Sequence, residues 1–287
     1  MKIVTDSATD TQLLQDKDIN IPIIPLKVNL GDTVYRDGID ITPDDFYVEL
    51  QKSSVLPVTS QPSAGEFAEL YRKLAKEDPE ILSIHMSSGL SGTYTSAVQG
   101  AALVPEANIT VIDTKTLSAA AGWQVWAAVK GLKLGWSKEQ ILAKMKMIAD
   151  STFSFYTLKE LKYLIHGGRI SHIKGLLASM LNIKPLIGVH KELGNYTQEG
   201  QARTFQKALD GLVKLIEEKN PLKEKIRVQV VHTGNPEGAQ SLREKIDEVF
   251  DCEWFPSGQI SYVLGAHTGP SMVGVGFSNA SAFEGLA

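Results

Sequence analysis

The sequence predicts an α/β fold of two domains, and the order of its apolar patterns carries the prediction. In the first half, short apolar runs alternate with stretches of helical spacing, which is typical of a doubly wound, mainly parallel sheet in a three-layer domain. From about Thr152 the pattern changes, and the turn in "ELGNY" indicates a hairpin and therefore a mixed sheet. We expect domains over residues 1–151 and 152–287.

In the first half, local signals place each element. The expected strands are 2–5, 21–30, 81–86 and 109–113. "TPDD" at 42–45 has the cap, the first-position proline and the early acids of a helix start. "SAGE" at 63–66 is a capping box, and an Ala-rich helix begins at about Leu117.

The second half has its own set of elements. The expected strands are 153–158, 185–189, 226–232 and 272–277. The expected helices are 201–218 and 236–249. Their order gives a second α/β domain.

Composition narrows the class of partner. The 287 residues include 29 basic and 33 acidic side chains, a net charge of -4, which argues against nucleic acid as a main partner. Cys252 is the only cysteine, and the six histidines form no HExxH pair, so neither a metal nor another cofactor is indicated. The chain is expected to bind a small molecule.

The sequence also bears on location. The amino terminus "MKIVTDSATD" turns polar after four residues and lacks the apolar core of a signal peptide. No stretch approaches the roughly 20 apolar residues of a membrane-spanning helix. We expect a soluble, cytoplasmic protein.

Polar residues follow several strands where those strands end. Asp6 and Ser7 end the first strand, and Thr59 and Ser60 precede the capping-box helix. Because the carboxyl ends of parallel strands meet at one edge of a sheet, these groups could converge on one rim with the loop that follows strand 81–86.

That loop, "SSGLSGTYTS" at 87–96, is rich in hydroxyl groups. A strand followed by small residues and a helix start presents free backbone N–H groups and a helix dipole, which suit a phosphate or a carboxylate. A plainer interpretation is that Ser91 only caps the helix. The density of hydroxyls opposite Thr59 favours an anion site.

Two other functions remain open at this point. "GLSG" and "GVGF" complete neither the Walker motif nor GxGxxG, yet a phosphate- or nucleotide-binding module is still compatible with the loop. Ser91 lies outside a GxSxG elbow, so a serine hydrolase or acyltransferase would need His267 as its base, with Asp6 or Asp113 behind it.

The ordered set "TDSATD", "TSQPS", "SSGLSGTYTSA", "GGRIS", "ARTFQKAL" and "GAHTGPSMVGVGF" resembles the DegV family of bacterial fatty-acid-binding proteins over essentially the whole chain. The resemblance implies two α/β domains with one long-chain fatty acid buried between them. It also implies a carrier rather than an enzyme, which presents the carboxylate to a separate ATP-binding fatty acid kinase for acyl phosphate formation.

The resemblance also assigns residues. The carboxylate contacts fall on Thr59, Ser91 and His267, and the motif arginines Arg169 and Arg203 are implied for a kinase- or phosphate-facing surface. Hydroxyls and the N–H of Gly92 can bind a carboxylate through charge-assisted hydrogen bonds. A protonated His267 would add a bond that weakens as pH rises. Arg169 follows a Gly-Gly pair, so its side chain is expected to be exposed.

One further segment suits a brief contact with a membrane. "HIKGLLASMLNIKPL" at 172–186 places apolar residues between lysines, a pattern typical of an interfacial helix. Leu177, Met180 and Leu181 are the candidate gate residues, and the alternative is an ordinary buried helix.

Overall fold

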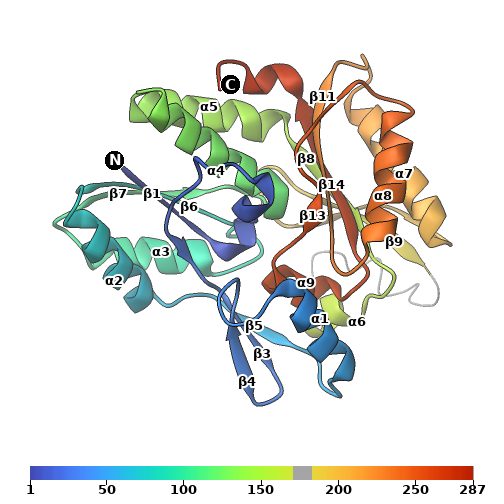
Figure 1. Ribbon diagram of the computed structural model, residues 1–287, viewed down its shortest axis with the longest axis horizontal. Helices are drawn as coiled ribbons and strands as arrows, with labels where there is room; N and C mark the ends of the chain where they lie inside the picture. The colour runs from blue at the N-terminus through green and yellow to red at the C-terminus, as the bar shows by residue number, and fades with distance from the viewer. Residues whose placement is uncertain (171–182, 287) are drawn as a thin grey trace.

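The structure, a computed structural model, describes residues 1–170 and 183–286 and is built on three β-sheets (Figure 1). The described strands are β1 (Lys2–Asp6), β2 (Ile23–Ile24), β3 (Lys27–Leu30), β4 (Thr33–Arg36), β5 (Val58–Ser60), β6 (Glu80–His85), β7 (Asn108–Asp113), β8 (Phe153–Thr157), β9 (Lys184–Val189), β10 (Tyr196–Ala202), β11 (Ile226–His232), β12 (Cys252–Trp254), β13 (Gly258–Gln259) and β14 (Val273–Asn279). The described helices are α1 (Pro43–Lys52), α2 (Ala64–Ala75), α3 (Thr93–Ala102), α4 (Ser118–Lys133), α5 (Lys138–Ser151), α6 (Lys162–His166), α7 (Phe205–Lys219), α8 (Pro236–Asp247) and α9 (Tyr262–Thr268), with short 3-10 turns η1 (Ser7–Thr9) and η2 (Thr11–Leu14).

The first sheet is parallel, in the order β2-β1-β6-β7. On one of its faces Val4 packs with Phe67 of α2. On the other face Ile3 packs with Trp123 of α4 and Ile141 of α5. Alternate residues of β1 therefore pack against helices on opposite faces of the sheet. The predicted three-layer, doubly wound arrangement is confirmed.

The second sheet is mixed, in the order β10-β9-β8-β14-β11-β12, with β13 also paired to β11. β14 is antiparallel to both of its neighbours, whereas β12 is parallel to β11. Helices α7 and α8 cover one face, where Leu212 and Leu242 pack with Val228 and Val275. On the other face Trp123 of α4 donates a hydrogen bond of 2.8 Å to Gln229. The predicted mixed sheet is confirmed, and α4 joins it to the first sheet.

The prediction of one strand over 21–30 is wrong. β2 pairs with β1 in the parallel sheet, whereas β3 pairs with β4 and β5 in a separate antiparallel sheet. Pro22 and Pro25 flank β2 and have no N–H for a ladder, so a continuous strand cannot form through them. The break carries the chain out to the small sheet, which delivers β5 to the site.

The first-half helix starts follow their local signals. Thr42 caps α1 with Pro43 in its first turn, and Ser63 and Glu66 form the reciprocal capping box of α2. The start predicted for the helix at 201–218 is wrong, because β10 continues its ladder to Ala202. α7 begins only after its cap at Thr204.

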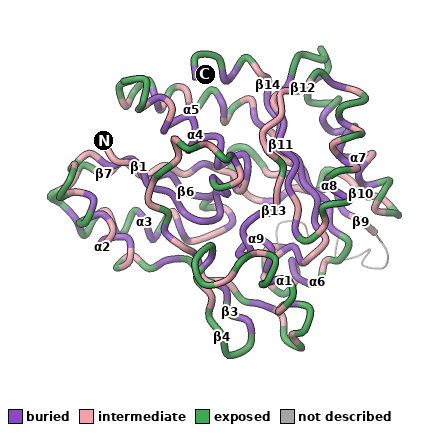
Figure 2. Tube along the Cα trace, viewed as in Figure 1, coloured by how far each residue is buried: buried purple, intermediate pink, exposed green. Residues whose placement is uncertain are grey.

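Helix α9 lies in the centre of the molecule, in contact with α1, α6, β3, β5 and η1 (Figure 1). Its core cluster draws on segments from both halves of the chain, including Val28 of β3, Phe46 of α1, Tyr156 of β8 and Leu164 of α6. Figure 2 shows buried segments along the strands of the large sheets and along α4 and α9. Among the described residues, no helix is both long and apolar enough to cross a membrane.

Candidate functional site

A small cavity brings together four side chains that are far apart in the sequence. Thr59, Ser91, Arg169 and His267 line it, so the convergence expected for the first, second and fourth of these is present. Its other lining residues are Leu26, Met86, Leu90, Tyr196, Val263 and Leu264. We call this space the head cavity.

Thr59 reaches the head cavity because of strand alternation. It lies opposite Val28 in the ladder between β5 and β3, and its Oγ1 is 2.7 Å from Nε2 of His267. Val58 and Ser60, on either side, are exposed. Ser60 therefore lies on the opposite face of β5 from the cavity, and its predicted supporting place in the site is not observed.

Ser91 lies at the start of α3, directly before the N-cap residue Gly92. Its Oγ is 2.9 Å from Oγ1 of Thr93 and accepts from the Thr93 N–H at 3.3 Å. A Cβ on Gly92 would lie 2.7 Å from Nε2 of Gln61, so glycine permits the "TSQPS" loop to lie against this helix start. Gly92 itself is beside the cavity and is not among its lining residues.

The other hydroxyls of the loop act differently. Ser87 donates to the backbone oxygen of Gly194 at 2.7 Å, and Ser88 accepts from Lys115 at 3.1 Å. The loop thus contacts the β9–β10 hairpin through Ser87 and the segment before α4 through Ser88, and Ser91 is its residue in the head cavity lining.

His267 comes from the last turn of α9. Burial and the nearby charges of Arg169 and His166 lower the pKa of His267 to about 3, so the ring is neutral at physiological pH. The expectation of a protonated His267, whose bond to the carboxylate would weaken as pH rises, is therefore not supported. Within the described residues, Nδ1 is buried without a hydrogen-bond partner.

The glycine pair before Arg169 has two separate purposes. A Cβ on Gly167 would overlap the His267 ring, so glycine makes room for it. Gly168 has φ +74°, and the turn directs Arg169 inward, where it donates to the backbone oxygens of Gly167 at 2.6 Å and Leu90 at 3.3 Å. The expectation of an exposed Arg169 is wrong, because it is partly buried in the head cavity.

The remaining predicted residues lie elsewhere. Asp6 accepts from His85 at 3.0 Å and from the Met86 N–H at 2.9 Å, and Ser7 accepts from the Leu26 N–H at 3.1 Å, so both brace buried strand ends outside the cavity lining. Arg203 is exposed between β10 and α7. The candidate gate residues lie outside the described part of the chain; they are Leu177, Met180 and Leu181.

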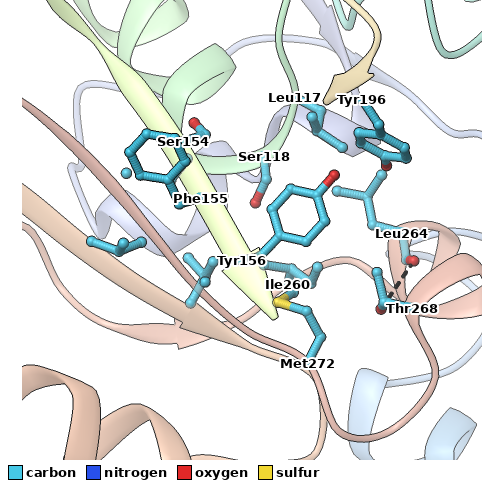
Figure 3. Close-up of a pocket in the computed structure, with 15 residues that line it drawn as sticks. Leu117, Ser118, Ser154, Phe155, Tyr156, Tyr196, Ile260, Leu264, Thr268 and Met272 are labelled. Carbon is cyan, nitrogen blue, oxygen red and sulfur yellow. Dashed lines mark hydrogen bonds between the residues drawn. The ribbon is translucent and has the colours of Figure 1, made fainter. Parts of the chain in front are cut away.

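A second, strongly apolar cavity lies between the mixed sheet and helices α4 and α9 (Figure 3). Tyr196 and Leu264 line both this cavity and the head cavity, so the two spaces adjoin. In Figure 3 Tyr156 projects from β8 toward Tyr196, and their ring centroids are 5.5 Å apart. We call this space the tail cavity.

The sequence "VGVGF" of β14 explains why the tail cavity exists. Val273, Val275 and Phe277 belong to the core beneath α7 and α8. Gly274 and Gly276 alternate with them and line the tail cavity, where the missing side chains leave space. In the sequence, this alternation of glycines with apolar residues was the pattern that could have indicated the cavity. No pattern indicated that Tyr196 and Leu264 would line it.

The described residues do not assemble a hydrolase triad. Ser91 bonds to Thr93, whereas Nε2 of His267 bonds to Thr59. In the part of the chain that the structure describes, no acid pairs with Nδ1 of His267, and the low pKa of His267 makes it a weak base. The geometry therefore does not support a reaction in which His267 activates Ser91.

These features define an α/β protein with a polar cavity that adjoins an apolar one. The family model described as "Uncharacterised protein, DegV family" matches residues 1–280, and the chain belongs to the DegV family. A DegV domain-containing protein from Staphylococcus aureus is 36% identical over 273 residues, covering 95% of this chain and 96% of that protein. YejH from Lactococcus lactis is 37% identical over 278 residues, covering 94% and 96%.

Solved structures agree with the fold. A DegV family protein from Thermus thermophilus, described as fatty acid binding, has a TM-score of 0.86 at 30% identity and covers 97% of this chain and 99% of that chain. A stearic acid-binding protein from Eubacterium ventriosum has a TM-score of 0.87 at 29% identity, with coverage of 97% and 98%. The family predicted from the motifs is confirmed.

Proposed function

We propose that this protein binds one long-chain fatty acid, with the carboxylate in the head cavity and the acyl chain in the tail cavity. The observation that carries the proposal is the pair of cavities that share Tyr196 and Leu264, one lined with hydrogen-bonding groups and a cation, the other apolar. A fatty acid has the same two parts in the same order. Relatives that bind fatty acids support this ligand class.

The head group is held by a relay of hydrogen bonds. With the proton of the neutral ring on Nε2, His267 donates to Oγ1 of Thr59, and in this tautomer the Thr59 hydroxyl is free to donate to the carboxylate. Ser91 adds a bond, and Arg169 supplies the positive charge. The N–H of Gly92, beside the cavity and outside its lining, remains a predicted contact. Charge-assisted bonds of this kind offset the desolvation of a carboxylate.

The acyl chain supplies most of the affinity. Burying each CH₂ contributes roughly 0.8 kcal/mol, so about 14 methylenes offer roughly 11 kcal/mol before ordering costs. A bilayer offers the chain a similar environment, so loading involves contact with a membrane surface. The gate formed by Leu177, Met180 and Leu181 remains a prediction.

We further propose that the protein is a carrier that presents the carboxylate to a separate ATP-binding kinase, which forms the acyl phosphate. Arg169 supports this role, because its guanidinium lies beside the head group, where it would face a phosphoryl group. Arg203 is exposed and is free to contact such a partner. Both halves of the chain contribute cavity residues, which agrees with a ligand held between domains 1–151 and 152–287.

Native mass spectrometry of protein purified without added lipid tests the binding proposal. The expected result is one fatty acid per chain, with binding weakened about tenfold to a hundredfold in Thr59→Ala or Ser91→Ala, the effect of removing a hydrogen bond to a charged group. Ser60→Ala is the matched control, since Ser60 is exposed on the other face of β5. An empty protein that takes up no fatty acid from vesicles would refute the proposal.

A further inference from the structure

Asp10 is a buried acid outside both cavities, and only 1% of its surface is exposed. It lies between η1 and η2 in a left-handed backbone conformation, with φ 50°. Its Oδ1 accepts from the Ser261 N–H at 2.8 Å, and its Oδ2 accepts from Oγ of Ser118 at 2.5 Å. One carboxylate thus holds two segments that are far apart in the sequence.

Those two segments are walls of the tail cavity. Ser118 is the first residue of α4, and it lines the cavity together with Leu117 and Ala119. Ser261 is the residue before α9, between the cavity residues Ile260, directly before it, and Leu264, three positions later. Figure 3 labels Ile260 and Leu264 in this wall. The distance between these walls therefore depends on the Asp10 carboxylate.

The wall at α4 is held in a strained conformation. Ser118 and Lys115 are non-glycine residues with φ of 51° and 55°. Such a conformation costs about 1–2 kcal/mol per residue and persists only where surrounding contacts impose it. The Ser118–Asp10 bond is one of those contacts, so the loop would relax if the bond weakened.

We propose that Asp10 is a positioning residue for the acyl chain: its ionised carboxylate holds the starts of α4 and α9 at the spacing that grips the ligand, and its protonation loosens that grip. The inference rests on the proposed fatty acid binding. It assigns to Asp10 control of affinity by pH, exerted through the cavity walls rather than through the head group.

The electrostatics place this control near neutral pH. Burial raises the pKa of Asp10 to about 6, against the hydrogen bonds from Ser118 and Ser261, which lower it. Asp37 lies nearby, and its pKa is raised to about 7 by burial and by the charge of Asp10. Tyr47 of α1 is the other titratable neighbour of both acids. Among the described residues, neither acid takes part in an ion pair.

A stability role does not account for this acid. An acid whose pKa is raised on folding destabilises the folded state at pH values above its unfolded value, 3.8, because its ionised form is disfavoured by burial. At neutral pH the ionised Asp10 therefore costs folding free energy, whereas it makes the two bonds that position the cavity walls.

The test is the binding of cis-parinaric acid, a fluorescent long-chain fatty acid, to delipidated protein between about pH 5.5 and 8, where the probe stays mostly ionised. The wild type should bind about fivefold more tightly at the upper end, the difference between hydrogen bonds to a charged and to a neutral group. Asp10→Asn should lose this pH step without a lower unfolding midpoint at pH 7.5.

Two acids serve as controls. Asp113 is the last residue of β7, directly before the loop that leads to Ser118. It accepts from the N–H groups of Ser88 and Lys115, and its pKa is lowered, so Asp113→Asn should keep the pH step. Asp37→Asn should keep the pH step as well. A step that persists in Asp10→Asn, or disappears in Asp37→Asn, would overturn the inference.

Ser118→Ala keeps the inference testable if Asp10→Asn does not fold. It removes a bond that lowers the pKa of Asp10, so the midpoint of the pH step should move upward, and an unmoved midpoint contradicts the inference. A wild type that binds no probe at any pH refutes the fatty acid proposal itself, whereas a wild type that binds without a pH step refutes only the role of Asp10.

Discussion

Replacing Gly167 with alanine tests the head cavity without removing any hydrogen-bonding group. Gly167 has φ -69°, which alanine adopts without strain, so the backbone can stay in place. The new Cβ would overlap Nδ1 of His267 and lie 2.7 Å from Cε1, well inside the 3.4 Å of ordinary van der Waals contact. The ring must therefore move by more than 0.7 Å or rotate.

The ring has little room to move. Its Nδ1 side faces Gly167, and its Nε2 is already 2.7 Å from Thr59, so a shift in that direction would compress the hydrogen bond. Rotation misaligns the bond that orients the Thr59 hydroxyl toward the carboxylate. Losing one such bond costs about 1–2 kcal/mol, which corresponds to an affinity lower by a factor of about 5 to 30.

Titration of delipidated protein with cis-parinaric acid measures the effect, and denaturant unfolding reports stability in parallel. Gly135→Ala is the matched control: Gly135 has φ +74°, no atom of the described residues lies within 4 Å of its Cβ position, and it lines neither cavity. It should lose about 1–2 kcal/mol of stability and keep the affinity. Wild-type affinity in Gly167→Ala would refute the view that the His267 position controls binding.

Two further predictions concern the tail cavity and the buried acids. Gly276→Leu should shift the preference toward shorter acyl chains, because the new side chain occupies space for about four carbons, roughly 3 kcal/mol of burial for the longest chains. Gly276→Ala should not shift this preference, because its Cβ meets its neighbours at an ordinary 3.6 Å. An unchanged chain-length profile of Gly276→Leu in competition assays would contradict this account. Asp37→Asn should raise the free energy of unfolding at pH 7.5 by about 2–4 kcal/mol, since the pKa of Asp37 rises from 3.8 to about 7 on folding and the wild type loses stability across that interval. The gain should nearly vanish at pH 4, and a gain of equal size at both pH values in urea unfolding would count against it.

The predictions from sequence succeeded where a local signal was strong. Capping residues placed the starts of α1 and α2, and alternation of apolar runs gave the parallel sheet. α9 was missed, because its seven residues are too short to show a helical period. Its position decides where His267 lies. The strand ends predicted that Thr59 and the loop of Ser91 converge, but the family resemblance alone placed His267 with them as a carboxylate contact.

Arg169 shows why the rest could not be read from the sequence. Gly-Gly before an arginine indicates a helix end, and a surface arginine is the ordinary outcome. The two glycines differ in what they do, since one makes room for a side chain 100 positions later and the other takes a positive φ. Only tertiary contacts distinguish these uses, and they turn the side chain inward.

The site is therefore determined as much by side chains that are missing as by those that bind. Glycine at 167 admits the His267 ring, glycine at 194 lets the β9–β10 hairpin rest on Ser87, and glycines in β14 open the tail cavity. Adding a methyl group at 167 or 194 would force atoms apart at the head group or at the loop that carries it, whereas at 276 it would fit. If the proposed function is right, substitutions at 167 should change affinity for every fatty acid alike, and substitutions at 276 should change only the preferred chain length. One competition series with both variants distinguishes these roles, because a common mechanism for the two positions would give parallel profiles.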